Sequence, residues 1–99
     1  MILNNGKDVP LSLKWRDLYQ LEQKDPQAFE SYTAAVKKME TKPTELAAVR
    51  VLYTGYLCAN EDPVTFEEFL DLLPDDHVTV LSEYTLLYRG KKKSSSAKS

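Results

Sequence analysis

Apolar and polar residues alternate near the start of the chain. Every second position from 9 to 15 is apolar: Val9, Leu11, Leu13 and Trp15. This period of two is typical of a strand with one buried face. The preceding Asn5-Gly6 pair favours a tight turn, because both central positions of such a turn must tolerate positive φ. The sequence therefore predicts a short N-terminal β-hairpin, and Pro10 places its second strand at an edge.

After the hairpin the apolar spacing changes to three and four residues, which is typical of helices that pack on a core. Leu18 and Leu21 give a first helix its apolar face. Asp25 as N-cap and Pro26 at the first helical position predict the start of a second helix. The apolar stripe of that helix consists of Phe29, Tyr32, Val36 and Met39. The sequence TKP at 41–43 ends it and precedes the next helix.

The segment LAAVRVLYTGYLCA, residues 46–59, carries a single charge, on Arg50. A helix that is apolar nearly all round is usually central and covered by its neighbours. Gly55 lies inside it and costs about 1 kcal/mol relative to alanine, so we expect a close helix contact there. Cys58 is the only cysteine, which excludes an intramolecular disulfide, and its apolar surroundings predict a buried side chain.

Two further helices have clear start signals. Thr65 and Glu68 have the spacing of a capping box. The side that this helix is expected to bury consists of Phe66, Phe69, Leu70 and Leu73. Pro74 ends the helix, and Asp75 or Asp76 begins the last one. The apolar face of the last helix is expected to consist of Val78, Leu81, Tyr84, Leu87 and Tyr88.

These patterns predict one mostly α domain in residues 1–89, with about five helices and the short β-hairpin, followed by a disordered Lys/Ser tail in residues 90–99. A chain of 99 residues is long enough for one core of ordinary size. Its apolar runs are far shorter than the roughly 18 residues that a membrane span needs. The N-terminus has no basic segment followed by an apolar run, so no secretory signal is expected.

Charge is distributed unevenly along the chain, whose formal net charge is −2. Residues 43–88 hold one basic and nine acidic side chains, whereas residues 89–99 hold five basic and no acidic ones. The acidic part repels phosphate, so binding of nucleic acid would depend on the tail. The tail lysines are Lys91, Lys92, Lys93 and Lys98. Short tails of this composition are commonly just solvated, so we expect no nucleic-acid partner.

The sequence contains no recognisable catalytic or metal-binding set. His77 is the only histidine, and it lies beside Asp75 and Asp76 at an expected helix start, where we expect it to be exposed. A calcium loop needs oxygen ligands at alternating positions and a central glycine, which the acids at 61–62 and 67–68 do not provide. The helix dipole explains acids at a helix N-terminus without a metal. We therefore expect no enzyme, no metal and no cofactor.

The remaining functional signal is aromatic. Tyrosine is enriched at protein interfaces because its large apolar body carries a polar tip. The candidate partner-binding residues belong to the central and last helices: Tyr53, Tyr56, Tyr84, Leu87 and Tyr88. The alternative interpretation is that these rings complete the core of a small helical protein.

Five pieces of sequence follow one another along the chain: LNNGKDVPLSL, WRDLYQLEQ, LAAVRVLYTGYLCAN, EDPVTFEEFLDLLPDD and a Lys/Ser tail. Their order resembles that of the small tail assembly chaperones of long-tailed bacteriophages, particularly phages of Gram-positive hosts. The similarity covers residues 1–90, and the best-matching parts are LAAVRVLYTGYL and DPVTFEEFLDLL.

The resemblance implies a role that is not enzymatic, and it assigns no catalytic residues. Such chaperones bind the tape measure protein, a long helical protein that sets tail length. They keep it soluble and help to recruit tail tube subunits. They act in the host cytoplasm and are absent from the finished virion. A longer form is often made by a programmed −1 frameshift, and residues 90–93, GKKK, would then be the trace of a slippery run in the messenger.

Other classes of protein remain open at this point. A structural connector or adaptor of the phage particle would have the same composition as a chaperone. A small nucleic-acid-binding protein would use the basic tail. An incompletely covered central helix would in addition favour self-association.

Overall fold

The computed structural model describes residues 1–90, which form an irregular N-terminal segment followed by five α-helices. The helices are α1 (Trp15–Lys24), α2 (Pro26–Thr41), α3 (Glu45–Ala59), α4 (Phe66–Leu72) and α5 (His77–Arg89). The mostly α fold that the sequence predicts is therefore confirmed. The tail predicted to be disordered lies outside the described residues, apart from Gly90.

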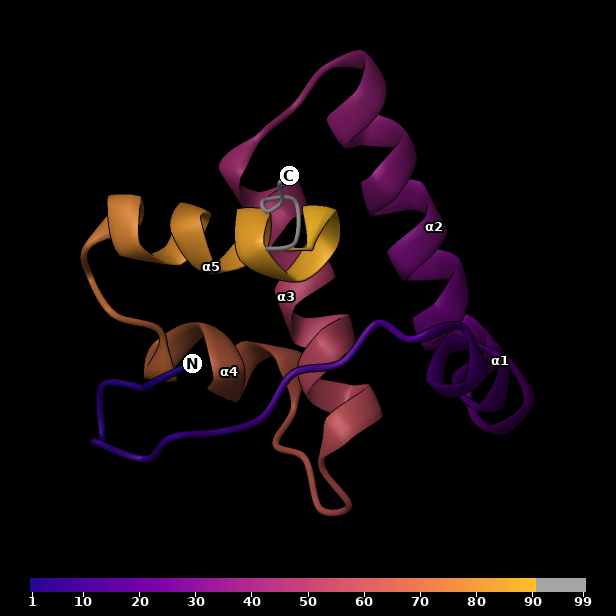
Figure 1. Cartoon of the computed structure of the whole chain (residues 1–99), viewed down its shortest axis with the longest axis horizontal. Helices are drawn as coiled ribbons and strands as arrows, with labels where there is room; N and C mark the ends of the chain where they lie inside the picture. The colour runs from indigo at the N-terminus through magenta and orange to yellow at the C-terminus, as the bar shows by residue number, and fades with distance from the viewer. Residues whose placement is uncertain (91–99) are drawn as a thin grey trace, which may run out of the picture.

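Helix α3 lies in the middle of the fold, with α2 along one side and α5 crossing it (Figure 1). From Ala47 to Tyr56, all its side chains except that of Arg50 are buried. The helix begins after Thr44, whose Oγ1 accepts a hydrogen bond from the backbone N–H of Ala47 at 3.1 Å. The central position follows from its composition, because an almost uncharged helix needs cover on every side.

The start signals of three helices are confirmed. Asp25 caps α2 by accepting a hydrogen bond from a backbone N–H of the first turn, and Pro26 holds the first helical position. Thr65 and Glu68 form the predicted capping box of α4. Of the two predicted starts of α5, Asp76 is the N-cap and accepts from two backbone N–H groups. These signals act within one turn of helix, so they do not depend on the rest of the fold.

Two hydrophobic clusters lie on the two sides of α3. The first joins α3, α4, α5 and the N-terminal segment, and its buried members are Leu3, Val9, Val49, Leu52, Tyr53, Tyr56, Phe69 and Val80. The second joins α1, α2 and α3, and its buried members are Leu18, Tyr32, Ala35, Ala47 and Val51. Tyr84 of α5 packs against both clusters.

The buried face of α5 differs from the predicted one in its first turn. Val78 is 73% exposed, whereas Val80 is buried against α3 and α4. Two positions along a helix rotate the side chain by roughly 200°, so only one of the two can face the core. Tyr84 and Leu87 follow Val80 at spacings of four and seven and continue its face.

The prediction of an N-terminal β-hairpin is wrong. The turn at Asn5-Gly6 forms, with Gly6 at φ 86°, but only one antiparallel bridge follows it, between Ile2 and Asp8. Beyond Val9 the chain leaves its partner and crosses α3 on its way to α1 (Figure 1). We call residues 1–14 the arm.

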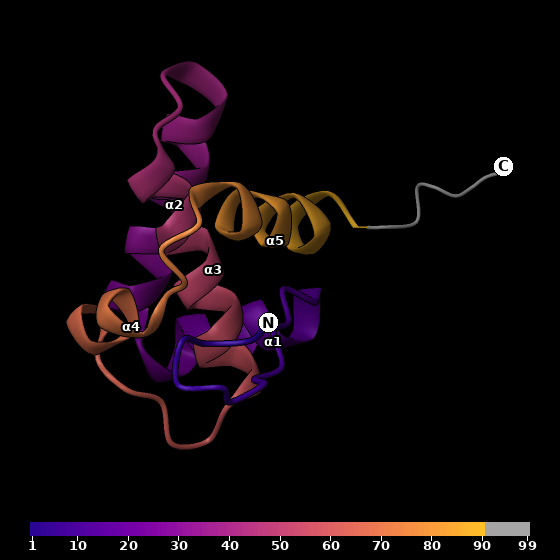
Figure 2. The same cartoon turned by 90° about the vertical axis from the view of Figure 1, so that its left-hand side faces the viewer.

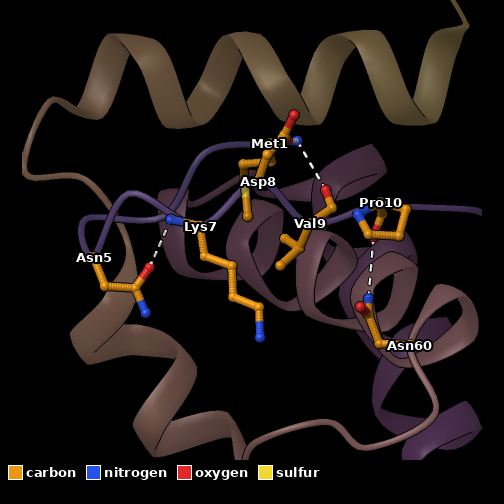
Figure 3. Close-up of polar contacts among 7 residues, drawn as sticks. All are labelled: Met1, Asn5, Lys7, Asp8, Val9, Pro10 and Asn60. Carbon is orange, nitrogen blue, oxygen red and sulfur yellow. Dashed lines mark hydrogen bonds and ion pairs between the residues drawn. The ribbon is translucent and has the colours of Figure 1, made fainter.

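Contacts with α3 replace the missing strand pairing. The backbone N–H of Ser12 donates to the carbonyl oxygen of Gly55 at 3.0 Å. The side-chain amide of Asn60 donates to the carbonyl oxygen of Pro10 at 3.1 Å (Figure 3). Pro10 itself has no N–H to donate to a strand partner. The alternating pattern therefore marks an extended segment with one buried side, but its polar groups bond to a helix.

The arm is also tied to the end of α4. The backbone N–H of Asn4 donates to the carbonyl oxygen of Leu72 at 2.7 Å. The side-chain amide of Asn4 donates to the backbone carbonyl oxygen of Asp71 at 2.8 Å. Trp15, expected on the buried side, is 88% exposed because the alternation ends at Leu13 and Trp15 begins α1.

Candidate functional site

An open groove runs between the arm and the side of α5. It has two adjoining parts of about 530 and 960 Å³, which share residues of both walls. The shared residues are Pro10, Leu11, Leu86 and Leu87. Figure 2 shows α5 above the N-terminal segment. We call this opening the arm groove.

One wall of the arm groove is the arm, which Asn60 fixes to the end of α3. The side-chain amide of Asn60 donates to the carbonyl oxygens of Tyr56 and Pro10, at 2.8 and 3.1 Å. The hydroxyl of Ser12 donates to the carboxylate of Asp17 in α1. Both ends of this wall are therefore held by side chains of helices, so the wall has a defined position.

The other wall is the last part of α5. Leu86 is 51% exposed and Tyr88 is 38% exposed, and both line the larger part of the groove. Leu87 lies deeper, because Gly55 of α3 lets it approach closely. A methyl group at Gly55 would lie 2.7 Å from Leu87 Cδ2, which confirms the expected close helix contact. The rings of Tyr84 and Tyr88 are stacked, with centroids 5.8 Å apart.

The two ends of the arm groove differ in chemistry. At one end Trp15, Tyr32 and Tyr88 line the opening, and Trp15 is the only tryptophan of the chain. At the other end lie Asp8 and Glu83. The Asp8 carboxylate accepts from the Met1 ammonium group at 3.2 Å, and Figure 3 shows the second bond of that group, to the carbonyl oxygen of Val9 at 3.0 Å.

The structure separates the five candidate partner-binding residues. Leu87 and Tyr88 line the arm groove, whereas Tyr84 is half-buried between the two core clusters. Tyr53 and Tyr56 are buried, so neither offers an exposed ring. Burial also raises the pKa of Tyr53 and of Tyr84. Tyr53 and Tyr56 therefore fit the alternative interpretation, in which the rings complete the core.

Both buried hydroxyls bond to the same residue. Tyr53 donates to the carbonyl oxygen of Val64 at 2.8 Å, and the N–H of Val64 donates to the Tyr56 hydroxyl at 3.1 Å. These bonds fix the loop between α3 and α4. The polar tip that makes tyrosine suitable for an interface serves here to hold a loop on the core.

Sequence reasoning missed Trp15 and Leu86 as residues of the groove. The alternating pattern predicts Trp15 on the buried side of a strand, and that strand does not form. Leu86 has a signal in the sequence, because Leu86, Leu87 and Tyr88 are three consecutive apolar residues of one helix. On a helix that is covered on one side only, three consecutive positions span too wide an arc to face the same core, so one of them is expected to be exposed.

His77 and Cys58 lie outside the lining of the arm groove. His77 is exposed, as expected, and its Nδ1 lies 2.7 Å from Oε1 of Glu45, so the pair joins the starts of α3 and α5. Cys58 is half-buried rather than fully buried, and burial raises the pKa of its thiol to about 11. Its Sγ lies 3.7 Å from the carbonyl oxygen of Asp17. The thiol is therefore protonated at neutral pH and is a poor nucleophile.

Two further searches cover residues 1–90 only. Within that part of the chain, no three side chains of His, Cys, Asp or Glu come together as a metal site would require. None of its helices combines the length and the apolar character that a membrane crossing requires.

Comparison of the chain with models of protein families, with curated protein sequences and with solved structures found no match.

Proposed function

We propose that this chain is a tail assembly chaperone, which holds apolar segments of the tape measure protein in the arm groove. The observation that carries the proposal is the groove itself, whose lining includes three exposed large apolar side chains, those of Trp15, Leu86 and Tyr88. Exposed apolar side chains that line a shared groove are typical of an interaction site. The resemblance of the sequence to tail assembly chaperones identifies the partner to test.

The size of the groove suits a complex that must later come apart. Burying three large apolar side chains contributes at most roughly 4–9 kcal/mol. Association costs about 4–15 kcal/mol in lost freedom of the two partners. Apolar contact in the groove alone therefore gives weak binding, as a chaperone requires if its partner is to enter the finished tail.

The charge of the chain supports the same role. Residues 43–88 hold nine acidic side chains and one basic one, and α3, α4 and most of α5 belong to this range. Copies of one acidic surface repel one another, so the groove can stay open without driving self-association. Recruitment of the tail tube protein, the second partner implied by the resemblance, would use a surface that the groove leaves free.

The test is co-purification of the chain with the tape measure protein encoded beside it. Leu86→Glu places a charge in the groove and should abolish co-purification. Leu46→Glu is the matched control, because Leu46 is also exposed but does not line the arm groove. Loss of the partner with both variants, or with neither, would contradict binding in the groove.

The content of purified phage particles separates a chaperone from a connector or adaptor of the virion. A chaperone is absent from the particles, whereas a connector remains in them. A nucleic-acid-binding protein is distinguished by its salt dependence. Its affinity would fall steeply with salt and would be abolished by removing residues 91–99, which lie outside the described structure.

A further inference from the structure

We propose that the arm groove binds its partner as an extended segment, which pairs as a strand with residues 11–13 of the arm. This inference rests on the proposed function and specifies the binding mode. The bound segment has apolar side chains at alternate positions and a lysine or arginine beside Glu83. Main-chain hydrogen bonds to the arm then add to the weak apolar contact, as in other proteins that bind a peptide at a strand edge.

The first argument is the free backbone edge of the arm. Successive peptide groups of an extended segment point to opposite sides. The carbonyl group of Pro10 and the N–H of Ser12 point toward α3, where Asn60 and Gly55 bond them. The polar groups of Leu11 and Leu13 therefore point away from α3. Within residues 1–90, no hydrogen bond reaches the N–H or the carbonyl oxygen of either leucine.

The second argument is the place of this edge in the groove. Leu11 and Leu13 both line its larger part, together with Leu86 and Tyr88 of α5. A strand has side chains on two faces, so a segment paired with the arm would place every second side chain against α5. Alternate apolar residues of the partner would then cover Leu86 and Tyr88.

The third argument is charge. The acidic end of the groove contains Asp8 and Glu83, and Asp8 is already paired with the Met1 ammonium group. Glu83 makes no hydrogen bond or ion pair with any side chain among the described residues. A lysine or arginine of the partner that reaches this end would find a free carboxylate. An acidic partner would instead be repelled by both side chains.

The experiment compares two synthetic peptides of identical composition with the intact chain. The first alternates valine and threonine and has a lysine at each end. The second contains the same residues, with valine at helical spacings of three and four. Fluorescence of Trp15, which lines the groove, reports binding, and amide hydrogen exchange of the chain reports the mode. Ser12 N–H should exchange slowly with and without peptide, whereas those of Leu11 and Leu13 should become protected only with the first peptide.

The matched variants are Leu13→Pro and Leu13→Ala. Both remove the leucine side chain, but only proline removes the N–H, so the first peptide should bind Leu13→Pro about fivefold more weakly than Leu13→Ala. Thermal unfolding of both variants checks that they fold. Glu83→Gln should weaken binding of the same peptide by up to about fivefold, whereas Glu67→Gln, on α4, should leave it unchanged.

The outcomes separate this inference from the proposed function. Protection of Leu11 and Leu13 with the first peptide supports strand pairing. Equal binding to both leucine variants, preference for the second peptide, or binding of neither peptide overturns it. Co-purification with the tape measure protein would still stand or fail by itself, because Leu86→Glu blocks the groove for an extended or a helical partner alike.

Discussion

At the scale of single residues, Tyr53 and Tyr56 show how a polar side chain can be both buried and structural. Their hydroxyls bond the carbonyl oxygen and the N–H of Val64, which lies 11 and 8 positions further along the chain. A net contribution of about 1 kcal/mol is typical of one such bond. Tyr56→Phe leaves the Val64 N–H unpaired in a half-buried place, so it costs at least as much.

We therefore expect Tyr53→Phe and Tyr56→Phe each to lower the free energy of unfolding by about 1 kcal/mol. Neither change should alter co-purification with the partner, since neither ring reaches the arm groove. Urea unfolding of the two variants and of the double variant measures the loss. Stability equal to that of the original chain would show that the loop is held by its apolar contacts alone.

Gly55 supports a second prediction at this scale. Alanine gains about 1 kcal/mol in helix propensity, but its methyl group would displace the end of the Leu87 side chain. We expect Gly55→Ala to change the free energy of unfolding by less than about 1 kcal/mol, because these terms oppose each other. Gly55→Leu adds a side chain that Leu87 cannot avoid and should destabilise by several times more. Equal unfolding midpoints in urea for these two variants would contradict the close approach of α5.

At the scale of helices, sequence predicts starts and ends well because their causes are local. The side chains of the capping residues Asp25, Thr65 and Asp76 bond only to the turn that follows them. The arm could not be predicted in this way. Its alternating pattern has the period of a strand, but its hydrogen-bond partner is Gly55, some forty positions away, and no local rule identifies that partner.

Of the two walls of the groove, only the one formed by α5 could be predicted, because helix periodicity is local and the packing of the arm is not. Leu87 and Tyr88 follow from the periodicity of the last helix, whereas the wall opposite them depends on how the arm packs. For Tyr53 and Tyr56 the sequence leaves two interpretations open, a partner-binding face and a place in the core. Their hydroxyls bond to Val64, and the loop that brings Val64 back to α3 has no regular apolar spacing from which its path could be predicted.

The N-cap of α5 gives a prediction of pH dependence. The side chain and the backbone N–H of Thr79 bond the Asp76 carboxylate and hold its pKa below its ordinary value of 3.8. A carboxyl with a lowered folded-state pKa contributes stability that is complete above the unfolded pKa and is lost as the pH falls through the folded one. We expect Asp76→Asn to flatten the loss of stability below about pH 4, while asparagine still caps the helix.

Urea unfolding at a series of pH values from 7 to 3 measures this effect. Asp75→Asn is the control, because it removes the same charge from the neighbouring position, whose side chain does not cap α5. If the free energy of unfolding of Asp76→Asn falls below pH 4 as steeply as that of the original chain, the Asp76 carboxylate does not contribute to acid sensitivity.

Helix α5 also separates a core tyrosine from a groove tyrosine. Tyr84 packs on both clusters, so Tyr84→Ala should lower the free energy of unfolding by about 2–4 kcal/mol. Tyr88 is more exposed, so Tyr88→Ala should cost less than about 1 kcal/mol yet weaken partner binding. Thermal unfolding and co-purification of both variants test the distinction. A reversed order of stabilities would assign Tyr88 to the core.

At the scale of the whole molecule, Asn60 couples the central helix to the arm. Its amide bonds Tyr56 at the end of α3 and Pro10 in the arm. We expect Asn60→Asp, which keeps the shape but not the donor, to lower stability by about 1–2 kcal/mol and to speed hydrogen exchange at Ser12 N–H. Exchange at the Ala48 N–H, within α3 and far from the arm, is the internal control. An unchanged rate at Ser12 would mean that the arm is held by its apolar side chains.

The bonds between Asn4 and the end of α4 join residues 67 and 69 positions apart. During synthesis, the first residues leave the ribosome long before the peptide groups that fix them have been made. Helices α1 to α3 and the bonds from the arm to Gly55 and Asn60 need no residue beyond 60, but the other wall of the groove is α5, which requires the chain to extend to Arg89. Contacts so distant in sequence form slowly and late in folding. A newborn chain therefore passes through a stage in which its first three helices exist and the arm groove does not.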